Sequence, residues 1–334
     1  LLRELTSQHK IKNIFCLVRD IEAAKQQFAD INQSNVNIKL LAGDVTNPSL
    51  GLNEQNISDL KDVQELFHLA AVVSLSTSIE AGQQIITTNV HGTKNVLNFL
   101  EKLPDLQNFY FVSTAYLGGY ERDPIPEDWI PKPKKFRNKY EESKWECENL
   151  IREHPATSKI NCTIVRPSIV LNNSIDNWRD LRKYTVYLYA YLLNKCLHRA
   201  TQEQIRITGA PTTRLNFVFV SELTEVIMMA RQSGQAQIIN AVAKQGISVE
   251  EVLNSIKKGS AINQKLLLQE EIPTSEMNPV ESAIHKYTSA FTPYLSYETK
   301  WIANTVFTRL EKDMTQQRIL AHIEGFCERM VKDE

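Results

Sequence analysis

The sequence predicts an α/β protein built on a doubly wound parallel sheet, with a smaller mixed domain at the C-terminal end. Two observations predict it. Short runs rich in β-branched and aromatic residues alternate with amphipathic stretches through the first half of the chain, and the pattern changes near Asn172. Strands separated by helices are joined by right-handed crossovers, which give a parallel sheet covered on both faces. We expect a first domain over residues 1–170 and a second over 171–334, partly interleaved with the first.

The elements follow from this periodicity. In the first domain we expect strands at 13–18, 36–41, 65–70, 108–113 and 159–166, and helices at 21–29, 78–101 and 140–153. In the second we expect strands at 215–220 and 237–241, and helices at 178–198, 222–231, 249–257 and 315–332. Tyr184, Tyr187 and Tyr191 recur at helical spacing, so this stripe is either core or the wall of an apolar channel.

Composition excludes several classes of function. The 334 residues are 42% hydrophobic and 23% charged, which is ordinary for a globular protein. A net charge of −1 gives no general attraction to nucleic acid or to an anionic membrane. The five cysteines are scattered and never form a CxxC pair, which favours a reducing compartment and disfavours a metal site. No apolar run reaches the ~18 residues of a transmembrane segment, so we expect a soluble, cytoplasmic protein.

The candidate chemistry centres on Tyr140 and Lys144. These residues are four positions apart in a predicted helix, so they share one face, and Thr114 ends the strand that precedes that helix. A neighbouring cation favours phenolate, so we expect Lys144 to lower the pKa of Tyr140 from its free value of about 10 and make it a usable acid or base. The spacing alone is weak evidence, because both residue types are common.

The order of several short motifs makes the pattern more specific, because together the chain resembles the extended short-chain dehydrogenase/reductases. The motifs are Cys16-Leu17-Val18-Arg19-Asp20, Gly43-Asp44-Val45, His68-Leu69-Ala70-Ala71, Asn89-Val90-His91-Gly92-Thr93, Val112-Ser113-Thr114, the Tyr140/Lys144 pair and Val165-Arg166-Pro167-Ser168. Within that family the chain is most similar to fatty acyl-CoA reductases and thioester reductase domains. The resemblance is strong up to Val170, and a weaker likeness continues in Phe291–Leu295 and Asn304-Thr305.

The resemblance implies a Rossmann-like domain with a nicotinamide cofactor. Tyr140 would donate a proton, Thr114 would hydrogen-bond the same substrate oxygen, and Lys144 would hold the nicotinamide ribose. Asp44 and Val45 would contact the adenine, Ala70 and Ala71 would let the backbone approach the dinucleotide, and Pro167 would complete the cofactor contacts. His68 and Asn89 are expected to be structural, with Asn89 bracing the active-site strand.

Arg19 decides the expected cofactor. In relatives that use NAD, an acidic residue usually follows the second strand of the family's fold and binds the ribose diol. Arg19 takes that place here, and a guanidinium there would meet a 2′-phosphate. This predicts NADP(H). The alternative is that Arg19 is a surface residue and Asp20 is the ribose ligand.

One part of the family pattern is missing. The family begins with a strand and a glycine-rich turn that holds the cofactor pyrophosphate, and no such turn occurs in this sequence. We expect that the N-terminus is truncated or that the chain is a piece of a longer polypeptide. The alternative is a natural protein that has lost the turn and the activity.

The sequence therefore predicts an NADPH-dependent reductase of a long acyl thioester, either acyl-CoA or an acyl chain on a carrier protein. A basic stretch formed by Lys132, Lys134, Lys135, Arg137 and Lys139 is either a solvated loop or a contact for the phosphate-bearing carrier, and it is too local for nucleic acid. The alternatives are a reductase or epimerase acting on a ketone or a nucleotide sugar, and a non-catalytic nucleotide-binding relative.

Overall fold

The computed structural model describes residues 1–8, 10–31, 36–303 and 316–333, and these divide into two compact units. The first unit contains Leu1–Leu117, Asn138–Val165 and Thr224–Ile239, and the second contains Gly118–Arg137, Arg166–Leu223 and Asn240–Glu334. The chain thus passes between the units several times, and each unit is assembled from segments that are distant in sequence.

The first unit holds the parallel strands and the helices that cover them. Its elements are α1 (Leu2–Thr6), β1 (Asn13–Val18), α2 (Ile21–Gln27), β2 (Asn37–Ala42), η1 (Pro48–Gly51), α3 (Glu54–Asp59), β3 (Glu65–His68), α4 (Ile79–Ile85), η2 (Ile86–His91), α5 (Gly92–Leu100), β4 (Asn108–Val112), α6 (Lys139–Glu153), η3 (Thr157–Lys159), β5 (Asn161–Pro167), α9 (Val220–Ser233) and β10 (Gln237–Ala241). β5, α9 and β10 each run a few residues into the second unit.

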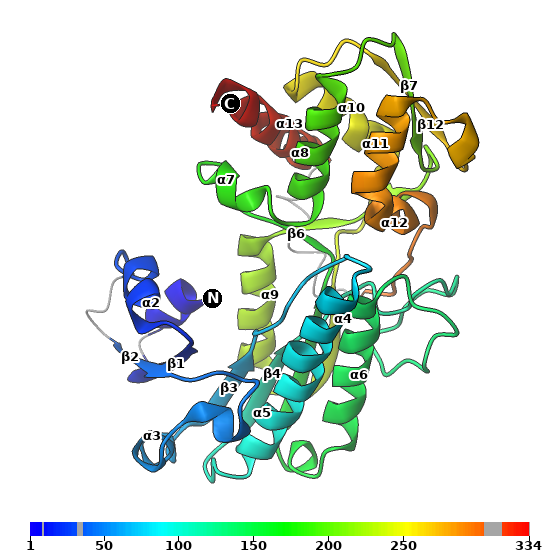
Figure 1. The fold of residues 1–334 in the computed structure, drawn as a ribbon. Coiled ribbons are helices and arrows are strands. Elements are labelled where there is room, and N and C mark those ends of the chain that lie inside the picture. Colours follow the sequence, from blue (N-terminus) through cyan, green and yellow to red (C-terminus); the bar gives the residue numbers. More distant parts are fainter. Residues whose placement is uncertain (9, 32–35, 304–315, 334) are drawn as a thin grey trace. The chain divides into compact units, whose positions relative to one another are not determined.

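The strands of the first unit form two sheets. β1 and β2 form a two-stranded parallel sheet, and β3, β4, β5 and β10 form a four-stranded sheet in the order β10-β5-β4-β3 (Figure 1). A standard doubly wound sheet has the order 3-2-1-4-5-6. The described strands follow this order in two separate parts, β2-β1 and β3-β4-β5, and no described strand pairs with both β1 and β3.

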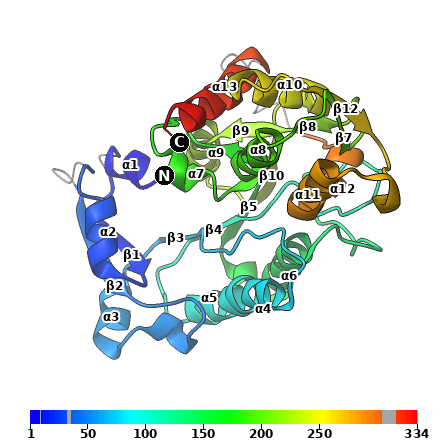
Figure 2. The same cartoon turned by 45° about the horizontal axis from the view of Figure 1, so that its top comes forward.

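Helices cover both faces of the four-stranded sheet. α4, η2 and α5 run on from one another without a break, and α6 packs against all three (Figure 1). α9 lies on the opposite face, where Arg231 forms an ion pair with Glu65 of β3 at 2.8 Å (Figure 2). The prediction of a Rossmann-like parallel sheet is therefore confirmed, and a strand buried between two helical layers accounts for the apolar runs in its sequence.

The second unit is mixed. Its elements are β6 (Ile169–Leu171), α7 (Trp178–Leu181), α8 (Thr185–Leu197), β7 (Gln204–Thr208), β8 (Arg214–Leu215), β9 (Phe217–Phe219), β11 (Ile247–Ser248), α10 (Val249–Gly259), β12 (Lys265–Gln269), η4 (Thr274–Glu276), α11 (Pro279–Thr288), η5 (Ser289–Phe291), α12 (Thr292–Ser296) and α13 (Gln316–Asp333). The strands pair as parallel β6–β9 and β7–β12 and as antiparallel β8–β11.

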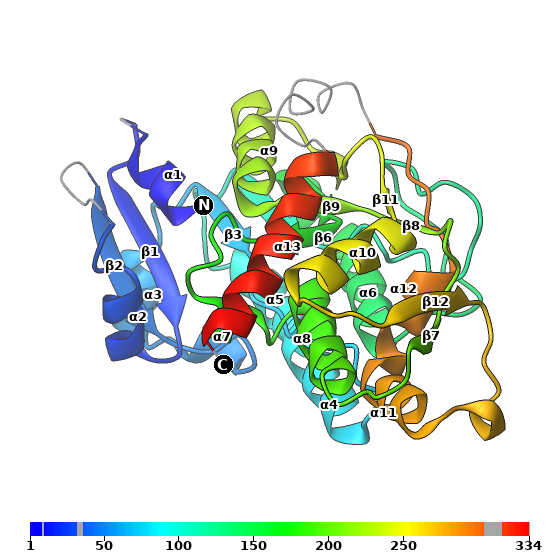
Figure 3. The same ribbon diagram turned by 90° about the horizontal axis from the view of Figure 1, so that it is seen from above.

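The core of the second unit lies between α8, α10 and α13. α10 and α13 lie side by side (Figure 3), and the approach is so close that a Cβ added at Gly259 would collide with the carbonyl oxygen of Glu324. A capping box at Ser248 and Glu251 fixes the start of α10. These contacts make the C-terminal helix part of the unit's core.

The predicted helix over residues 178–198 is wrong as a single element. It breaks into α7 and α8 around Tyr184, which precedes α8 and is 56% exposed, and Thr185 has a φ of 41°. Tyr187 is buried against Phe326 and bonds His322 at 2.8 Å, whereas Tyr191 stacks with Arg182 and Lys195. Tyr184 therefore lies outside the helical register that Tyr187 and Tyr191 share in α8, because Thr185, with its positive φ, stands between them.

The other predicted elements lie within a few residues of their observed bounds. The predicted strand at 215–220 is broken into β8 and β9, and Thr315, Asn304 and Thr305 fall outside the described residues. No helix among the described residues has the length and apolarity needed to span a membrane.

Candidate active site

The N-terminal turn of α6 carries Tyr140 and Lys144. The Asn138 side chain caps this helix by accepting from the Glu141 amide at 3.0 Å. Tyr140 and Lys144 are one turn apart, and the helix packs its buried face, which includes Lys144, Cys147 and Ile151, against α5 and η2. The cap and this packing fix the direction in which both side chains leave the helix.

The structure brings Thr114 to Tyr140. Thr114 follows the end of β4, is buried, and its side chain interacts with the Tyr140 phenol. Its hydroxyl oxygen also accepts from the Tyr116 amide at 3.3 Å, which holds the side chain in place. A hydroxyl from a strand end and a phenol from a helix therefore meet at one point.

Lys144 is buried one helical turn after Tyr140. Its ammonium donates to the carbonyl oxygen of Val112, the last residue of β4, at 2.8 Å, and lies 4.7 Å from the Phe111 ring centre. Burial lowers the pKa of Lys144, while Cys147 and Glu148 act in the opposite direction. The lysine thus ties α6 to the strand that carries Thr114.

The predicted direction of the Tyr140 pKa is wrong for this structure. Burial is the largest cause and raises the pKa of Tyr140 above its ordinary value, and the interaction with Thr114 opposes that change without reversing it. The physical reason is that removing a phenolate from water costs more free energy than its interactions with nearby groups contribute. Tyr140 is therefore held as a neutral phenol, the form that can donate a proton.

A buried polar network that the sequence only partly indicated positions α6. Asn89, in the π-helical turn η2, accepts from the Val72 amide at 2.7 Å, donates to the Val72 carbonyl at 3.0 Å and donates to Ser143 Oγ at 3.0 Å. Ser143 in turn donates to the backbone carbonyl of Tyr140 at 2.7 Å. Asn89 therefore joins the loop after β3 to the first turn of α6. In the sequence, the indication of this role for Ser143 is its position directly before Lys144.

His68 belongs to the same network. Its Nε2 lies 3.0 Å from the Thr93 hydroxyl, which donates to Cys147 Sγ at 3.3 Å. Burial lowers the pKa of His68 to about 3, so the ring is neutral. This histidine is a satisfied core residue. Among the described residues, no group of three or more His, Cys, Asp or Glu side chains could hold a metal ion.

Arg19 and Asp20 follow β1 and have different surroundings. The Asp20 carboxylate caps α2 by accepting from the Ala23 amide at 3.0 Å, whereas Arg19 is exposed. A carboxylate already engaged at a helix N-terminus is less available to a ribose diol. The arrangement leaves the guanidinium as the group beside the strand end that can meet an anion.

The remaining predicted cofactor residues lie at strand ends with mixed exposure. Asp44 accepts from the Thr46 amide and hydroxyl at 2.8 and 2.9 Å, which makes a turn after β2. Val45 is buried against Gly92 of α5, while Ala70 is exposed and Ala71 half-buried after β3. Pro167, the last residue of β5, is buried and belongs to the second unit.

These are the residues that the sequence predicts to contact the nucleoside part of a dinucleotide, and a group that would hold its pyrophosphate is not among them. The first glycine of the sequence is Gly43, at the end of β2, so no glycine-rich turn precedes α2. The adenosine and nicotinamide ends therefore have candidate contacts in this chain, and the pyrophosphate has none of the usual kind.

The basic stretch before α6 is partly engaged within the second unit. The Arg137 guanidinium lies 5.7 and 5.3 Å from the Tyr120 and Tyr294 rings and donates to Thr299 Oγ1 at 2.7 Å. Lys135 also lies over Tyr120, and the first-unit residue Lys139 pairs with Glu142 at 2.7 Å. Arg137 is therefore a packing residue, while Lys132, Lys134 and Lys135 stay exposed.

A parallel sheet flanked by helices, with a Thr–Tyr–Lys constellation between the end of one strand and the following helix, defines an extended short-chain dehydrogenase/reductase. Residues 1–227 match the family model described as the male sterility protein, an NAD-binding family. The chain belongs to this family, whose members are NAD(P)-dependent oxidoreductases.

Comparison with individual proteins agrees with that assignment. Fatty acyl-CoA reductase 1 of Xenopus laevis is 28% identical over 155 residues, which cover 39% of this chain and 29% of the relative. The chain therefore matches less than a third of that protein's length.

Solved structures show the same fold. The terminal R domain from the myxalamid PKS-NRPS biosynthetic pathway superposes with a TM-score of 0.72 and 19% identity, covering 99% of this chain and 87% of that chain. UDP-glucuronic acid 4-epimerase from Bacillus cereus has a TM-score of 0.66 and 16% identity, covering 98% and 95%. One fold thus occurs in a terminal R domain of a PKS-NRPS pathway and in a UDP-glucuronic acid 4-epimerase.

Proposed function

We propose that this chain is the reductase of a long acyl thioester and that it uses NADPH. The observation that carries the chemistry is the meeting of Thr114, Tyr140 and Lys144 at the carboxyl end of β4. The substrate class is supported by relatives named as fatty acyl-CoA reductases and by the fold of a terminal R domain.

The residues of the site would act on the thioester carbonyl. A bound nicotinamide nucleotide supplies the hydride. Negative charge then develops on the carbonyl oxygen, and donors already aimed at that oxygen give most of the rate. Tyr140 delivers its proton there, and Thr114 hydrogen-bonds the same atom. Lys144 supplies a positive charge one helical turn from Tyr140. Collapse of the resulting hemithioacetal releases the thiol and leaves an aldehyde.

We infer that exposed apolar side chains in the segment after β3 contact the acyl chain. Leu69, Val73 and Ile79, in the segment between β3 and α4, are 49%, 50% and 85% exposed. β3 is the neighbour of β4, so this segment begins at the same sheet edge as Thr114. Large exposed apolar side chains gathered in one segment are typical of a surface that binds an apolar partner.

We expect Arg19→Ala to remove a preference for NADPH over NADH. One or two charge-assisted bonds to a 2′-phosphate, at about 1.5–3 kcal/mol each, give a preference of one to two powers of ten. The measurement is fluorescence titration of both cofactors. Lys12→Ala removes an exposed cation at the opposite end of β1 and is the matched control. Equal affinities for the two cofactors in the unaltered chain would contradict the assignment of Arg19 as the residue that binds the 2′-phosphate.

We expect the rate of NADPH oxidation to rise steeply with acyl length. Each methylene buried on the apolar surface contributes roughly 0.8 kcal/mol, so kcat/KM should grow about fourfold per methylene until the surface is full. The assay compares acyl-CoAs of increasing length with ketones and nucleotide sugars. It is run with the chain as it stands and with a version that adds a β-strand and a glycine-rich turn ahead of Leu1, so that weak pyrophosphate binding is separated from the chemistry.

A variant distinguishes the apolar surface from a general effect of chain length. Val73→Ser should flatten the length dependence, whereas Tyr287→Ser, at a 54% exposed aromatic residue of α11, should leave it unchanged. Turnover of ketones or nucleotide sugars without turnover of thioesters would instead favour the alternative function, a reductase or epimerase that acts on a ketone or a nucleotide sugar.

A further inference from the structure

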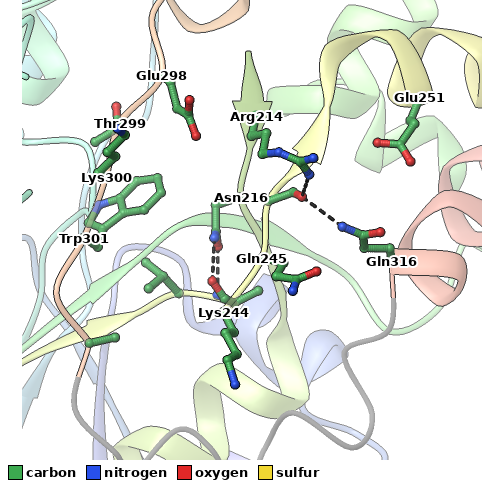
Figure 4. Close-up of a pocket in the computed structure, with 14 residues that line it drawn as sticks. Arg214, Asn216, Lys244, Gln245, Glu251, Glu298, Thr299, Lys300, Trp301 and Gln316 are labelled. Atoms are coloured by element: carbon green, nitrogen blue, oxygen red, sulfur yellow. Dashed lines mark hydrogen bonds between the residues drawn. The ribbon is translucent and has the colours of Figure 1, made fainter. Parts of the chain in front are cut away.

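A cavity of about 690 Å³ lies in the second unit, and its lining groups form hydrogen bonds with one another (Figure 4). The side-chain amide of Asn216 donates to the Ala243 carbonyl and accepts from the Ala243 amide, both at 2.8 Å. Arg214 donates to the Gly246 carbonyl, also at 2.8 Å. These bonds hold the loop around Ala243 against β8 and the residue after it, so the packing of the unit itself explains the bonded polar groups of this wall.

The first unit holds a buried thiol that the proposed reaction does not use. Cys147 lies on α6, three residues after Lys144, and is fully buried. Its Sγ accepts from the Thr93 hydroxyl at 3.3 Å and donates to the backbone carbonyl of Asn89 at 3.1 Å. A buried free cysteine usually behaves as a small apolar residue. Two polar contacts on one thiol therefore indicate a role beyond filling space.

Two side chains of α6 hold the same residue of η2. Asn89 donates through its side-chain amide to Ser143 Oγ at 3.0 Å, and its carbonyl accepts from the Cys147 thiol. Ser143 and Cys147 are four residues apart, so they lie one turn apart on the same face of α6. A single contact lets a helix pivot about it, whereas a second contact one turn away resists that pivoting. The Ser143 and Cys147 contacts together therefore fix α6 against η2.

The turn that these contacts hold has an uncommon backbone. Asn89 lies in η2, a π-helical turn between α4 and α5. Such turns pair each amide with the carbonyl five residues back, are rare, and often occur at functional sites. Here the turn offers both the side chain and the carbonyl of one residue to α6. The uncommon turn and the two contacts thus meet at the helix that carries Tyr140 and Lys144.

Hydrogen-bond chemistry assigns the proton on each member of the series that runs from His68 through Thr93 and Cys147 to Asn89. A backbone carbonyl only accepts, so the single proton of the Cys147 thiol points to Asn89. The sulfur then accepts from the Thr93 hydroxyl, whose oxygen accepts from Nε2 of His68 at 3.0 Å. His68 is therefore the neutral tautomer with its proton on Nε2. Burial lowers the pKa of His68 to about 3, which agrees with a neutral ring.

We propose that Cys147 is a positioning residue for Tyr140 and Lys144, the pair that α6 presents to the candidate site. The inference rests on the proposed reaction and adds a residue that acts through this pair. Lys144 stands between Ser143 and Cys147 and donates to the Val112 carbonyl at 2.8 Å. Displacement of a catalytic group by about 1 Å can cost about 10² in rate, so loosening of α6 against η2 lowers turnover.

Two replacements of Cys147 separate hydrogen bonding from packing. Cys147→Ser keeps a donor and an acceptor in a smaller side chain, whereas Cys147→Val fills the space and removes both. We expect Cys147→Val to lower the single-turnover rate of NADPH oxidation with a long acyl-CoA at least about tenfold, and Cys147→Ser to stay within about threefold of the unaltered chain. A residue that only fills space would give the opposite order. Cys162→Val, at a half-buried thiol of β5, is the matched control and should keep the full rate.

The tautomer of His68 reports on the same contacts without any turnover. Nitrogen NMR of labelled histidine should show the proton on Nε2 in the unaltered chain. Cys147→Val removes the acceptor of the Thr93 hydroxyl, so this hydroxyl can turn to donate to His68, and the form with the proton on Nδ1 should appear. Cys147→Ser and Cys162→Val should both keep the Nε2 form. A His68 with its proton on Nδ1 in the unaltered chain would overturn the inference, even if no Cys147 variant folds.

The two measurements separate this inference from the proposed reaction. A full rate in Cys147→Val, or a slower rate in Cys147→Ser than in Cys147→Val, would overturn the positioning role while thioester reduction stands. If the unaltered chain reduces a ketone and no thioester, the proposed function fails, and the same order of variants is expected with the ketone because the same Tyr140–Lys144 pair acts. Without turnover of either substrate, a tautomer that changes in Cys147→Val supports the inference and an unchanged tautomer overturns it.

Discussion

Tyr140→Phe should abolish thioester reduction while leaving NADPH affinity nearly unchanged. The variant removes a proton that is donated only in the transition state, and a positioned general acid contributes about 10²–10⁴ in rate. The ring itself, and the packing of α6, are kept. The measurement is single-turnover NADPH oxidation together with cofactor titration.

Tyr184→Phe is the matched control, because it removes the hydroxyl of an exposed tyrosine. It should keep the full rate. The raised pKa of Tyr140 adds a check on the pH profile: since the phenol is the proton-bearing form and burial favours it, activity should not fall between pH 6 and 9 through loss of this proton. A Tyr140→Phe variant that retains more than a tenth of the rate would contradict the assignment.

Lys144→Ala should lower both the turnover rate and the affinity for NADPH, and it should also destabilise the fold. The ammonium donates to the buried Val112 carbonyl at 2.8 Å. Leaving a buried acceptor without that partner costs about 1–3 kcal/mol, and the deleted side chain adds a cavity. We expect a loss of turnover of at least about 10² and a lower thermal unfolding midpoint.

Lys144→Met separates charge from packing. It keeps most of the side-chain volume and removes the ammonium, so turnover should fall as far as in the alanine variant while the unfolding midpoint falls less. Normal turnover in Lys144→Met would show that the lysine only fills space. Cofactor titration of both variants then reports whether the charge also contributes to binding.

Much of the fold follows from local periodicity. The strands at Asn13–Val18 and Gln237–Ala241 have the bounds that the sequence predicts, and α6 begins one residue earlier than predicted. Side-chain periods of 2 and 3.6 are properties of neighbouring residues, so they can be seen in one sequence. The spacing of Tyr140 and Lys144 is of the same kind, because an interval of four places two residues on one helical face in any context.

The strand order cannot be predicted from periodicity. The sequence showed that a glycine-rich turn was missing, but the pairing decided that β1 and β3 end separate sheets. Likewise, no local sequence pattern in Trp178–His198 indicates the positive φ of Thr185, which divides α7 from α8. Such backbone choices depend on what the segment packs against, and those partners come from elsewhere in the chain.

The sequence by itself determined the order of elements, the family and the three residues of the candidate site. Only the tertiary structure decided the burial that keeps Tyr140 protonated and the Asn89–Ser143 brace. The physical reason is that burial and hydrogen bonding between distant segments are properties of a folded chain. A pKa follows from the water that a group loses on folding, and that loss is set by residues far from it in sequence.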